Sequence, residues 1–112
     1  MADRVADHLN HFNAGVRSGD WLAFLATFAE HARVEFTGAP AGPYLGRDAI
    51  VEMYRSTPPD DTIEAFDIRS TETTDTIRFE WGRGGTGTLW LAWTGRGEIN
   101  RMVVDIDVGP PA

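Results

Sequence analysis

The stretch GVRSGDWLAFLATFAEHARVEFT, residues 15–37, decides the fold of this chain. One amphipathic helix ends within it at Gly19, a second helix begins at once, and a short segment rich in β-branched and aromatic residues follows. Asp20 is suited to cap the second helix, because its carboxylate can accept hydrogen bonds from the free amides of a helix start. The order helix, helix, strand predicts helices that close one side of a curved sheet around an apolar interior.

Apolar residues recur at helical spacing in three segments. The first runs from about Asp3 to Gly19, the second follows Asp20, and the third begins near Asp48 and ends at residues 57–61. Each segment places its apolar side chains on one face: Val5, Leu9, Phe12 and Val16 in the first, Trp21, Phe24, Leu25 and Phe28 in the second, and Ile50, Met53 and Tyr54 in the third.

The period of the later sequence is two residues, which is typical of half-buried antiparallel strands. We expect strands at 33–37, 63–69, 76–81, 86–93 and 99–108, with glycine-rich turns between the last three. No βαβ crossover is present in this pattern, so hairpin follows hairpin. The sequence therefore predicts one α+β domain over residues 1–112, with three N-terminal helices packed on a curved, mainly antiparallel sheet.

The amino-acid composition excludes several kinds of binding partner and several catalytic mechanisms. The chain has seventeen acidic and ten basic residues, and its arginines are scattered singly along the sequence. We therefore expect no surface that binds nucleic acid or an anionic membrane. The chain has no cysteine and no lysine, which excludes disulfides, thiolate chemistry and Schiff bases. No segment resembles a signal peptide or a membrane span. We expect a cytoplasmic protein that needs no cofactor or metal and binds a small hydrophobic molecule.

Three motifs connect the chain to a known superfamily: GDWLAFLATFAEHARVE at 19–35, GRDAIVEMY at 46–54 and TIRFEW at 76–81. With these the chain resembles the nuclear transport factor 2-like superfamily, the cone-shaped α+β fold of ketosteroid isomerases, SnoaL-like polyketide cyclases and limonene epoxide hydrolases. The resemblance implies the fold and a homodimer formed through the sheet. It does not imply one function, because the same fold hosts many enzymes and proteins without enzymatic activity.

The resemblance does not carry over the catalytic groups of these enzymes. Phe36 stands at the position of the isomerase base, Phe12 at that of its helix tyrosine and Leu89 at that of its protonated aspartate. The carboxylate on the last strand of the epoxide hydrolases falls at or near Val104, and the adjacent Asp105 points to the opposite face of the strand. Steroid isomerisation by the known route is therefore disfavoured.

Three residues stay as candidate catalytic groups. Tyr54 matches a pocket tyrosine that supports the oxyanion hole of the isomerases. His31, in the expected turn before the first strand, is either a solvated residue or an acid or base at the cavity rim. Asp105 and Asp107 share one strand face, where mutual repulsion would raise one pKa, or they pair with arginines or with a second copy. His8 and His11 have the spacing of metal ligands, but they are expected to lie beside or away from the apolar stripe.

The apolar residues on the expected inner faces predict a ligand pocket, or else they fill the interior completely. Tyr44, on a Gly- and Pro-rich loop, would serve as a lid over an open pocket. The expected pocket residues are Phe12, Phe28, Phe36, Tyr44, Tyr54, Phe79, Trp81, Leu89, Leu91, Met102 and Val104.

Two classes of function remain open. The first is a SnoaL-like or ketosteroid isomerase-like enzyme, of isomerase, cyclase or hydrolase type, that positions a small hydrophobic molecule and moves a proton. The second is a binding or dimerisation module of the same fold without catalysis. On the outer sheet face, Trp90 and Val103 alternate with Arg78 and Arg101, a mixture typical of a sheet that packs against a partner, and this favours a homodimer.

Overall fold

The structure is a computed structural model that describes residues 3–37 and 42–106. The helices and strands follow one another along the chain as α1 (Arg4–Ser18), α2 (Leu22–Leu25), β1 (Phe28–Thr37), β2 (Tyr44–Leu45), α3 (Arg47–Ser56), β3 (Ile63–Ser70), β4 (Thr74–Trp81), β5 (Thr86–Trp93) and β6 (Ile99–Ile106).

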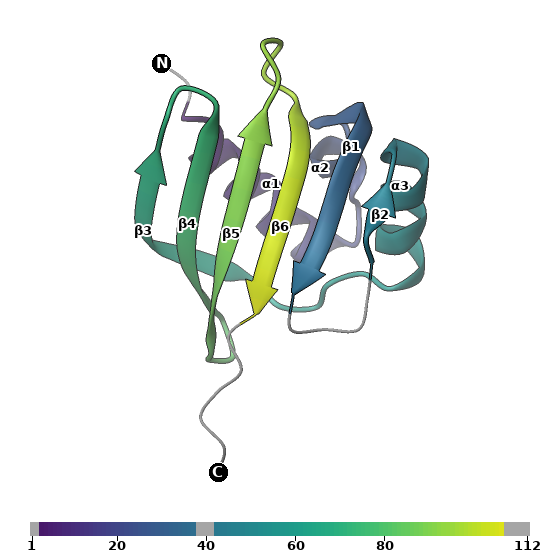
Figure 1. The fold of residues 1–112 in the computed structure, drawn as a ribbon. Helices are drawn as coiled ribbons and strands as arrows, with labels where there is room; N and C mark the ends of the chain where they lie inside the picture. The colour runs from purple at the N-terminus through teal and green to yellow at the C-terminus, as the bar shows by residue number, and fades with distance from the viewer. Residues whose placement is uncertain (1–2, 38–41, 107–112) are drawn as a thin grey trace.

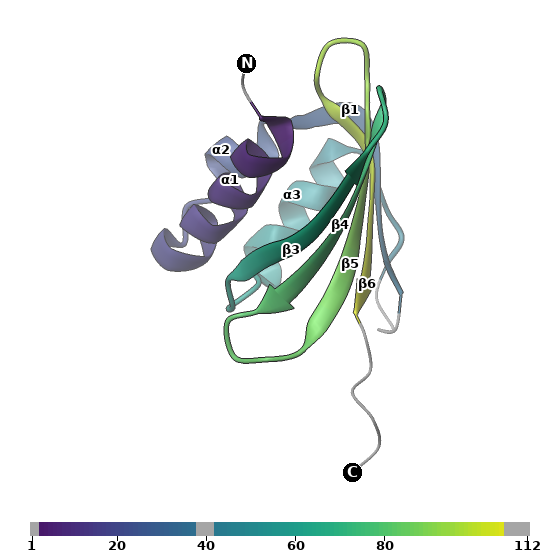
Figure 2. The same cartoon turned by 90° about the vertical axis from the view of Figure 1, so that its left-hand side faces the viewer.

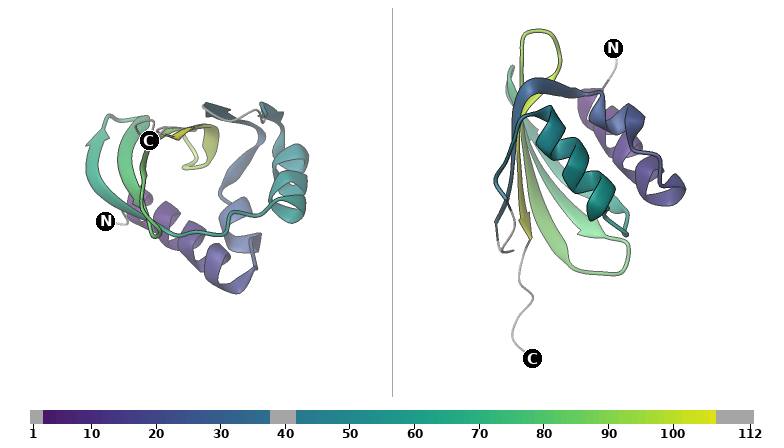
Figure 3. Two further views of the ribbon diagram at one scale, coloured as in Figure 1. Left: turned by 90° about the horizontal axis from the view of Figure 1, so that it is seen from below. Right: turned by 90° about the vertical axis from the view of Figure 1, so that its right-hand side faces the viewer.

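The strands form one sheet in the order β2-β1-β6-β5-β4-β3 (Figure 1). The β1–β6 pair is parallel and the other pairs are antiparallel. All three helices lie on one face of this sheet, and no described element covers the other face (Figure 2). Seen from below, the sheet curves around the side on which the helices pack (Figure 3). The predicted α+β architecture is confirmed.

Helix α1 has the boundaries that its sequence predicts. The Asp3 carboxylate accepts hydrogen bonds from the backbone amides of Val5 and Ala6, at 3.0 and 3.2 Å. Gly19 ends the helix with φ of 78°, in the left-handed region that glycine adopts without strain. These two caps fix the length of the helix.

The second helix is much shorter than predicted. Helix α2 has only four residues, because the Thr27 hydroxyl donates a hydrogen bond to the Phe24 carbonyl and strand pairing begins at once. Phe28 is the first residue of β1, opposite Ile99 of β6, so the strand is longer than the predicted 33–37. The helical spacing of the sequence predicts Phe28 on the second helix, but the residue pairs with β6 and belongs to a strand. His31 consequently lies within the strand rather than in a turn before it.

Two further expectations need correction. Tyr44 lies on the short strand β2, opposite Val34 of β1, and not on a loop. Strand β3 contains an irregularity between Ala65 and Asp67, where the register against β4 shifts by one residue. This bulge leaves Phe66 58% exposed instead of half-buried.

The core fills the space between the helices and the concave face of the sheet. Phe24 of α2, Phe28 of β1, Ile50 of α3 and Phe79 of β4 have at most 1% of their surface exposed. No helix among the described residues is long and apolar enough to cross a membrane. The predicted cytoplasmic location stays a prediction. Asp107, the second carboxylate of the predicted pair, lies outside the described residues.

Candidate functional site

A small cavity, which we call the inner cavity, lies on the concave side of the sheet and has a volume of about 60 Å³. Strands β1, β3, β4, β5 and β6 all contribute to its wall, together with α1, α3 and the segment after α3. Eight predicted pocket residues line it: Phe12, Phe36, Tyr54, Phe79, Trp81, Leu89, Met102 and Val104. The structure adds His8, Pro59 and Ile63.

Three predicted pocket residues do not line the inner cavity. Phe28 and Leu91 are fully buried core residues. Tyr44 is half-buried on β2, where its ring meets the Phe36 ring edge-on at 6.1 Å between centroids. It therefore packs against a wall residue from the neighbouring strand and does not line the cavity as a lid.

The four residues that the resemblance matches to catalytic groups of other enzymes all face the inner cavity. Phe12, Phe36, Leu89 and Val104 line it, from α1, β1, β5 and β6 respectively. These four positions supply only apolar surface to the cavity. Any acid or base in this cavity must come from elsewhere in the chain.

His8 is the titratable side chain that the sequence reasoning missed. It lies one helical turn before Phe12, has only 3% of its surface exposed, and its Nδ1 atom makes no hydrogen bond to any described residue. Burial, and secondarily the nearby His11, lowers its pKa to about 4. The imidazole is therefore neutral near pH 7. It lies on the wall of the inner cavity, and its Nδ1 atom has no described hydrogen-bond partner. Its i, i+4 spacing to Phe12 is the sequence feature that could have predicted that His8 faces the same side of α1 as Phe12.

Tyr54 reaches the inner cavity from α3, as its helical spacing predicts. Its ring is 2% exposed and packs at 5.1 Å from both the Trp21 and the Phe24 ring centroids. Burial raises the pKa of its hydroxyl well above the ordinary value, so the group stays a neutral donor. The His8 ring also lies 5.1 Å from the Phe24 ring, which places the two polar side chains on flanks of the same phenylalanine.

The other two catalytic candidates do not meet Tyr54. His31 is exposed on β1 and lines a surface depression beside Gly46 and Arg47. Asp105 is exposed on β6 and accepts a hydrogen bond from the Thr37 hydroxyl at 2.8 Å. Neither residue lines the inner cavity.

A buried ionic cluster closes the end of the sheet next to α1. The Asp75 side chain is 1% exposed and accepts hydrogen bonds from Arg4 Nε and Trp93 Nε1, both at 2.7 Å. The alternation of Ile77 and Phe79 on β4 points Asp75 inward, but the strand was predicted to begin only at residue 76. Because both donors bind its Oδ2 atom, we assign this carboxylate a structural role and not a catalytic one.

His8 separates the inner cavity from a second depression. A groove of about 230 Å³ is lined by Arg4, Asp7, His8 and His11 of α1, and by Trp93 and Glu98 among others. The Nδ1 atom of His11 is buried and has no described hydrogen-bond partner, contrary to the expectation that this side chain points well away. Within the described ranges no three metal-ligating side chains come together.

This arrangement suits proton transfer on a neutral molecule. A neutral imidazole with an unpaired nitrogen can accept a proton, and a neutral phenol can donate a hydrogen bond to a developing oxyanion. Both lie in apolar surroundings, where such interactions are stronger than in water.

Comparison with known proteins agrees with the fold. The SnoaL-like domain family matches residues 8–107. Curated protein sequences give no significant match. Among solved structures, an NTF2-like protein from Anabaena variabilis is 18% identical, with a TM-score of 0.77 over 94% of this chain and 87% of its own.

Two other solved structures carry names of enzymes. The epoxide hydrolase/cyclase-like enzyme SalBIII, described with a role in pyran ring formation in the polyether salinomycin, is 19% identical, with a TM-score of 0.72 over 94% of this chain and 91% of its own. A steroid delta-isomerase from Pseudomonas aeruginosa is 11% identical, with a TM-score of 0.70 over 97% of this chain and 83% of its own. At these identities the likeness concerns the fold.

Proposed function

This chain belongs to the SnoaL-like domain family, and from that membership we propose that it binds a small neutral organic molecule in the inner cavity and moves a proton on it. His8 would accept the proton, and the Tyr54 hydroxyl would hold the substrate oxygen. The observation that carries this proposal is the buried, unpaired Nδ1 atom of His8 on the wall of an apolar cavity. Buried polar atoms are normally paired, so an unpaired one calls for an explanation.

The low pKa of His8 is compatible with this role. A general base works best when its pKa lies near the operating pH, but the aspartate base of ketosteroid isomerase has a pKa only modestly above its ordinary value. A base that is neutral at pH 7 is always in the form that accepts a proton. The cost of forming an imidazolium in the cavity would be offset by the oxyanion that forms beside it.

Cavity size restricts the substrate. Drug-sized ligands occupy pockets of about 300–1,000 Å³, and the inner cavity of about 60 Å³ is far smaller. The part of the substrate that enters must therefore be a fragment of about two or three heavy atoms, such as the carbonyl end of a ketone or enone.

Deuterium exchange tests the proposal without knowledge of the natural substrate. Small cyclic ketones and enones are incubated with the protein in D₂O, and exchange next to the carbonyl is followed by NMR. We expect His8→Gln to slow the catalysed exchange about a hundredfold, which is the scale of general acid–base catalysis. Tyr54→Phe should also slow exchange while it changes ligand affinity by less than about tenfold, since one neutral hydrogen bond contributes roughly 0.5–1.5 kcal/mol.

The matched control is His31→Gln, since this histidine is exposed and lies outside the cavity. Its exchange rate should equal that of the wild type. Unchanged exchange in His8→Gln would reject His8 as the base. Ketone binding without any exchange would favour the second function, a binding module without catalysis, for which the absence of a carboxylate among the described residues of the cavity wall is the supporting observation.

We further propose that two copies pair through the outer face of the sheet. No described element covers this face, and it carries an exposed Phe66 and a half-buried Trp90. Arg78 lies over the Phe66 ring at 5.6 Å and Arg101 over the Trp90 ring at 5.5 Å. Aromatic and arginine side chains are enriched in protein interfaces, which supports a homodimer.

A further inference from the structure

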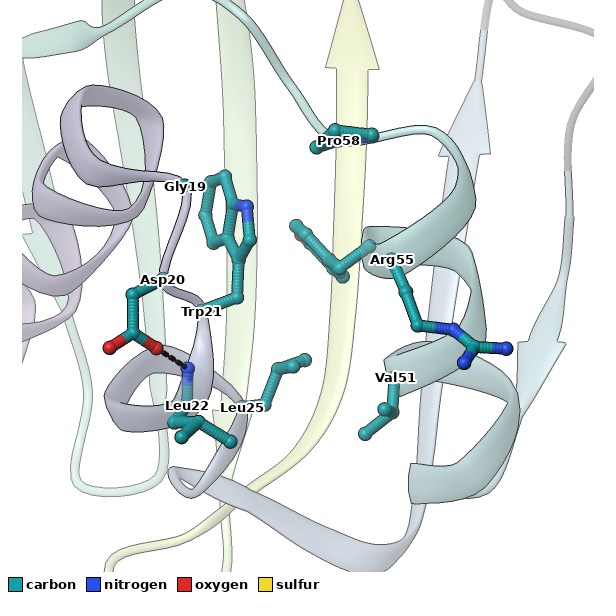
Figure 4. A pocket seen from close by; sticks show the side chains of 9 residues that line it. Gly19, Asp20, Trp21, Leu22, Leu25, Val51, Arg55 and Pro58 are labelled. Carbon is teal, nitrogen blue, oxygen red and sulfur yellow. Dashed lines mark hydrogen bonds between the residues drawn. The ribbon is translucent and has the colours of Figure 1, made fainter.

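A further pocket, distinct from the inner cavity and from the groove beside His8, lies between α2 and α3. This α2–α3 cleft has a volume of about 350 Å³, within the range of pockets for organic ligands. Figure 4 shows Trp21, Leu22 and Leu25 on the α2 side, Val51 on the α3 side and Pro58 beyond them. Tyr54 completes this apolar lining.

Trp21 forms a rigid aromatic wall of the cleft. Its indole ring packs edge-on against Phe12 at 5.6 Å and Phe24 at 5.5 Å, and in a tilted geometry against Tyr54 at 5.1 Å. The glycine at position 15 gives it room, because a Cβ atom there would lie 2.5 Å from the ring. A ring held on several sides loses little conformational entropy when a ligand packs against it.

The cleft is flanked by apolar side chains that the fold leaves exposed. Leu22 is 77% exposed and Val51 is 36% exposed, on opposite walls. Both belong to the few large hydrophobic residues exposed in the described part of the chain, and a molecule in the cleft would cover them. Burial of apolar surface would then favour binding.

The two charged side chains at the rim are directed away from the cleft. The Asp20 carboxylate accepts a hydrogen bond from the Leu22 amide at 3.1 Å. The Arg55 guanidinium pairs with Glu52 at 2.5 Å. Figure 4 shows both charged groups pointing away from the space beside Trp21. No charged group among the described residues that line the cleft is directed at the space beside Trp21, and a charged ligand would lose its hydration there, so the cleft suits a neutral molecule.

We propose that the α2–α3 cleft is a binding site for a neutral organic molecule of about two fused rings, packed against Trp21. The site is separate from the inner cavity and does not depend on the proposed proton transfer. The two cavities share Tyr54 as a wall residue, so a ligand in the cleft lies directly behind the hydroxyl-bearing ring of the inner cavity.

The test uses two probes of equal ring size and different charge, 2-acetonaphthone and 2-naphthoate. Each is titrated into ¹⁵N-labelled full-length protein, and chemical-shift changes are mapped. We expect 2-acetonaphthone to shift the Trp21 indole and the amides of Leu22 and Val51, and 2-naphthoate to bind at least about tenfold more weakly. Leu22→Arg should weaken 2-acetonaphthone about tenfold, and Leu45→Arg, which changes another exposed leucine outside the cleft, should not.

Three results would overturn the proposal. Equal affinity for the two probes would contradict a neutral site. Shifts confined to inner-cavity residues such as Leu89 and Val104 would place the ligand there and would reject the cleft as its site. Shifts at Leu22 and Val51 that depend on protein concentration without any probe would identify a second copy of the chain as the occupant.

Discussion

Replacing Arg4 by methionine tests the buried ionic cluster at the end of the sheet. Arg4→Met keeps much of the aliphatic stem and removes the 2.7 Å pair with Asp75, leaving a carboxylate that is 1% exposed with Trp93 as its strongest remaining donor. Breaking a fully buried pair costs about 3–5 kcal/mol. Because the Arg4 side chain is 35% exposed, screening by solvent reduces this, and we expect about 2–3 kcal/mol.

The loss should depend on pH in a defined direction. Burial alone would raise the pKa of Asp75, but hydrogen bonds from Arg4, Ser70 and Trp93 and the charge of Arg4 outweigh it and hold the pKa below 3.8. A lowered pKa in the folded state contributes stability that is present above the unfolded value and is lost as the pH falls through the folded value. Arg4→Met removes two of the causes that lower this pKa, the Arg4 hydrogen bond and the Arg4 charge, so the pKa of Asp75 should rise. The difference between wild type and Arg4→Met should therefore be full at pH 7 and shrink below about pH 4.

Urea unfolding followed by circular dichroism at pH 7 and at pH 3.5 measures this difference. At pH 7 the expected loss also corresponds to a fall in Tm of roughly 8–12 °C, at about 4 °C per kcal/mol for a domain of this size. The control is Arg55→Met, whose pair with Glu52 is 75% and 59% exposed and should contribute less than about 1 kcal/mol. An equal loss at both pH values, or one no larger than in the control, would refute the reasoning.

Three other predictions concern separate parts of the molecule. The pKa of His8 is lowered from 6.5 to about 4, so the wild type should lose about 3 kcal/mol of stability as the pH falls from 6.5 to 4, and His8→Phe should remove that loss in urea titrations across this range. Gly87→Ala should destabilise the protein by about 1–3 kcal/mol, because a Cβ atom would lie 2.5 Å from the Phe79 ring and 2.9 Å from the Asp105 carbonyl, whereas Gly95→Ala, with open space around it, should be nearly neutral in thermal unfolding. Trp90→Glu on the outer sheet face should yield a monomer in analytical ultracentrifugation at concentrations where the wild type and Leu45→Glu sediment as dimers; a wild type that is itself monomeric would reject the dimer.

Much of the fold follows from local pattern. Helix α1 begins and ends where a capping aspartate and a glycine predict, and β5 spans the predicted Thr86–Trp93. Phe28 could not be placed correctly, since its helical spacing to Phe24 competes with pairing to Ile99, more than 70 positions away in the sequence. The bulge that exposes Phe66 likewise depends on the register against β4, which local periodicity does not contain.

The candidate site was predictable in its walls and not in its chemistry. Phe36, Leu89 and Met102 line the inner cavity because strand alternation alone points them inward. His8 was placed at the border of an apolar stripe, and its burial depends on how α1 packs on the sheet. Asp75 was missed because the predicted strand began one residue too late, although the alternation through Ile77 and Phe79 would have pointed it inward.

The inner cavity combines apolar residues at the family's catalytic positions with polar groups at others. If this interior, with Phe12, Phe36 and Leu89 on its walls, were only apolar core, a buried histidine on the same wall would destabilise the fold, because its Nδ1 atom is buried without a described hydrogen-bond partner. A leucine or phenylalanine at position 8 would fill that place more favourably. The proposed ligand would give this imidazole the hydrogen-bond partner that the described residues do not supply, and the exchange experiment on His8 tests whether it does so.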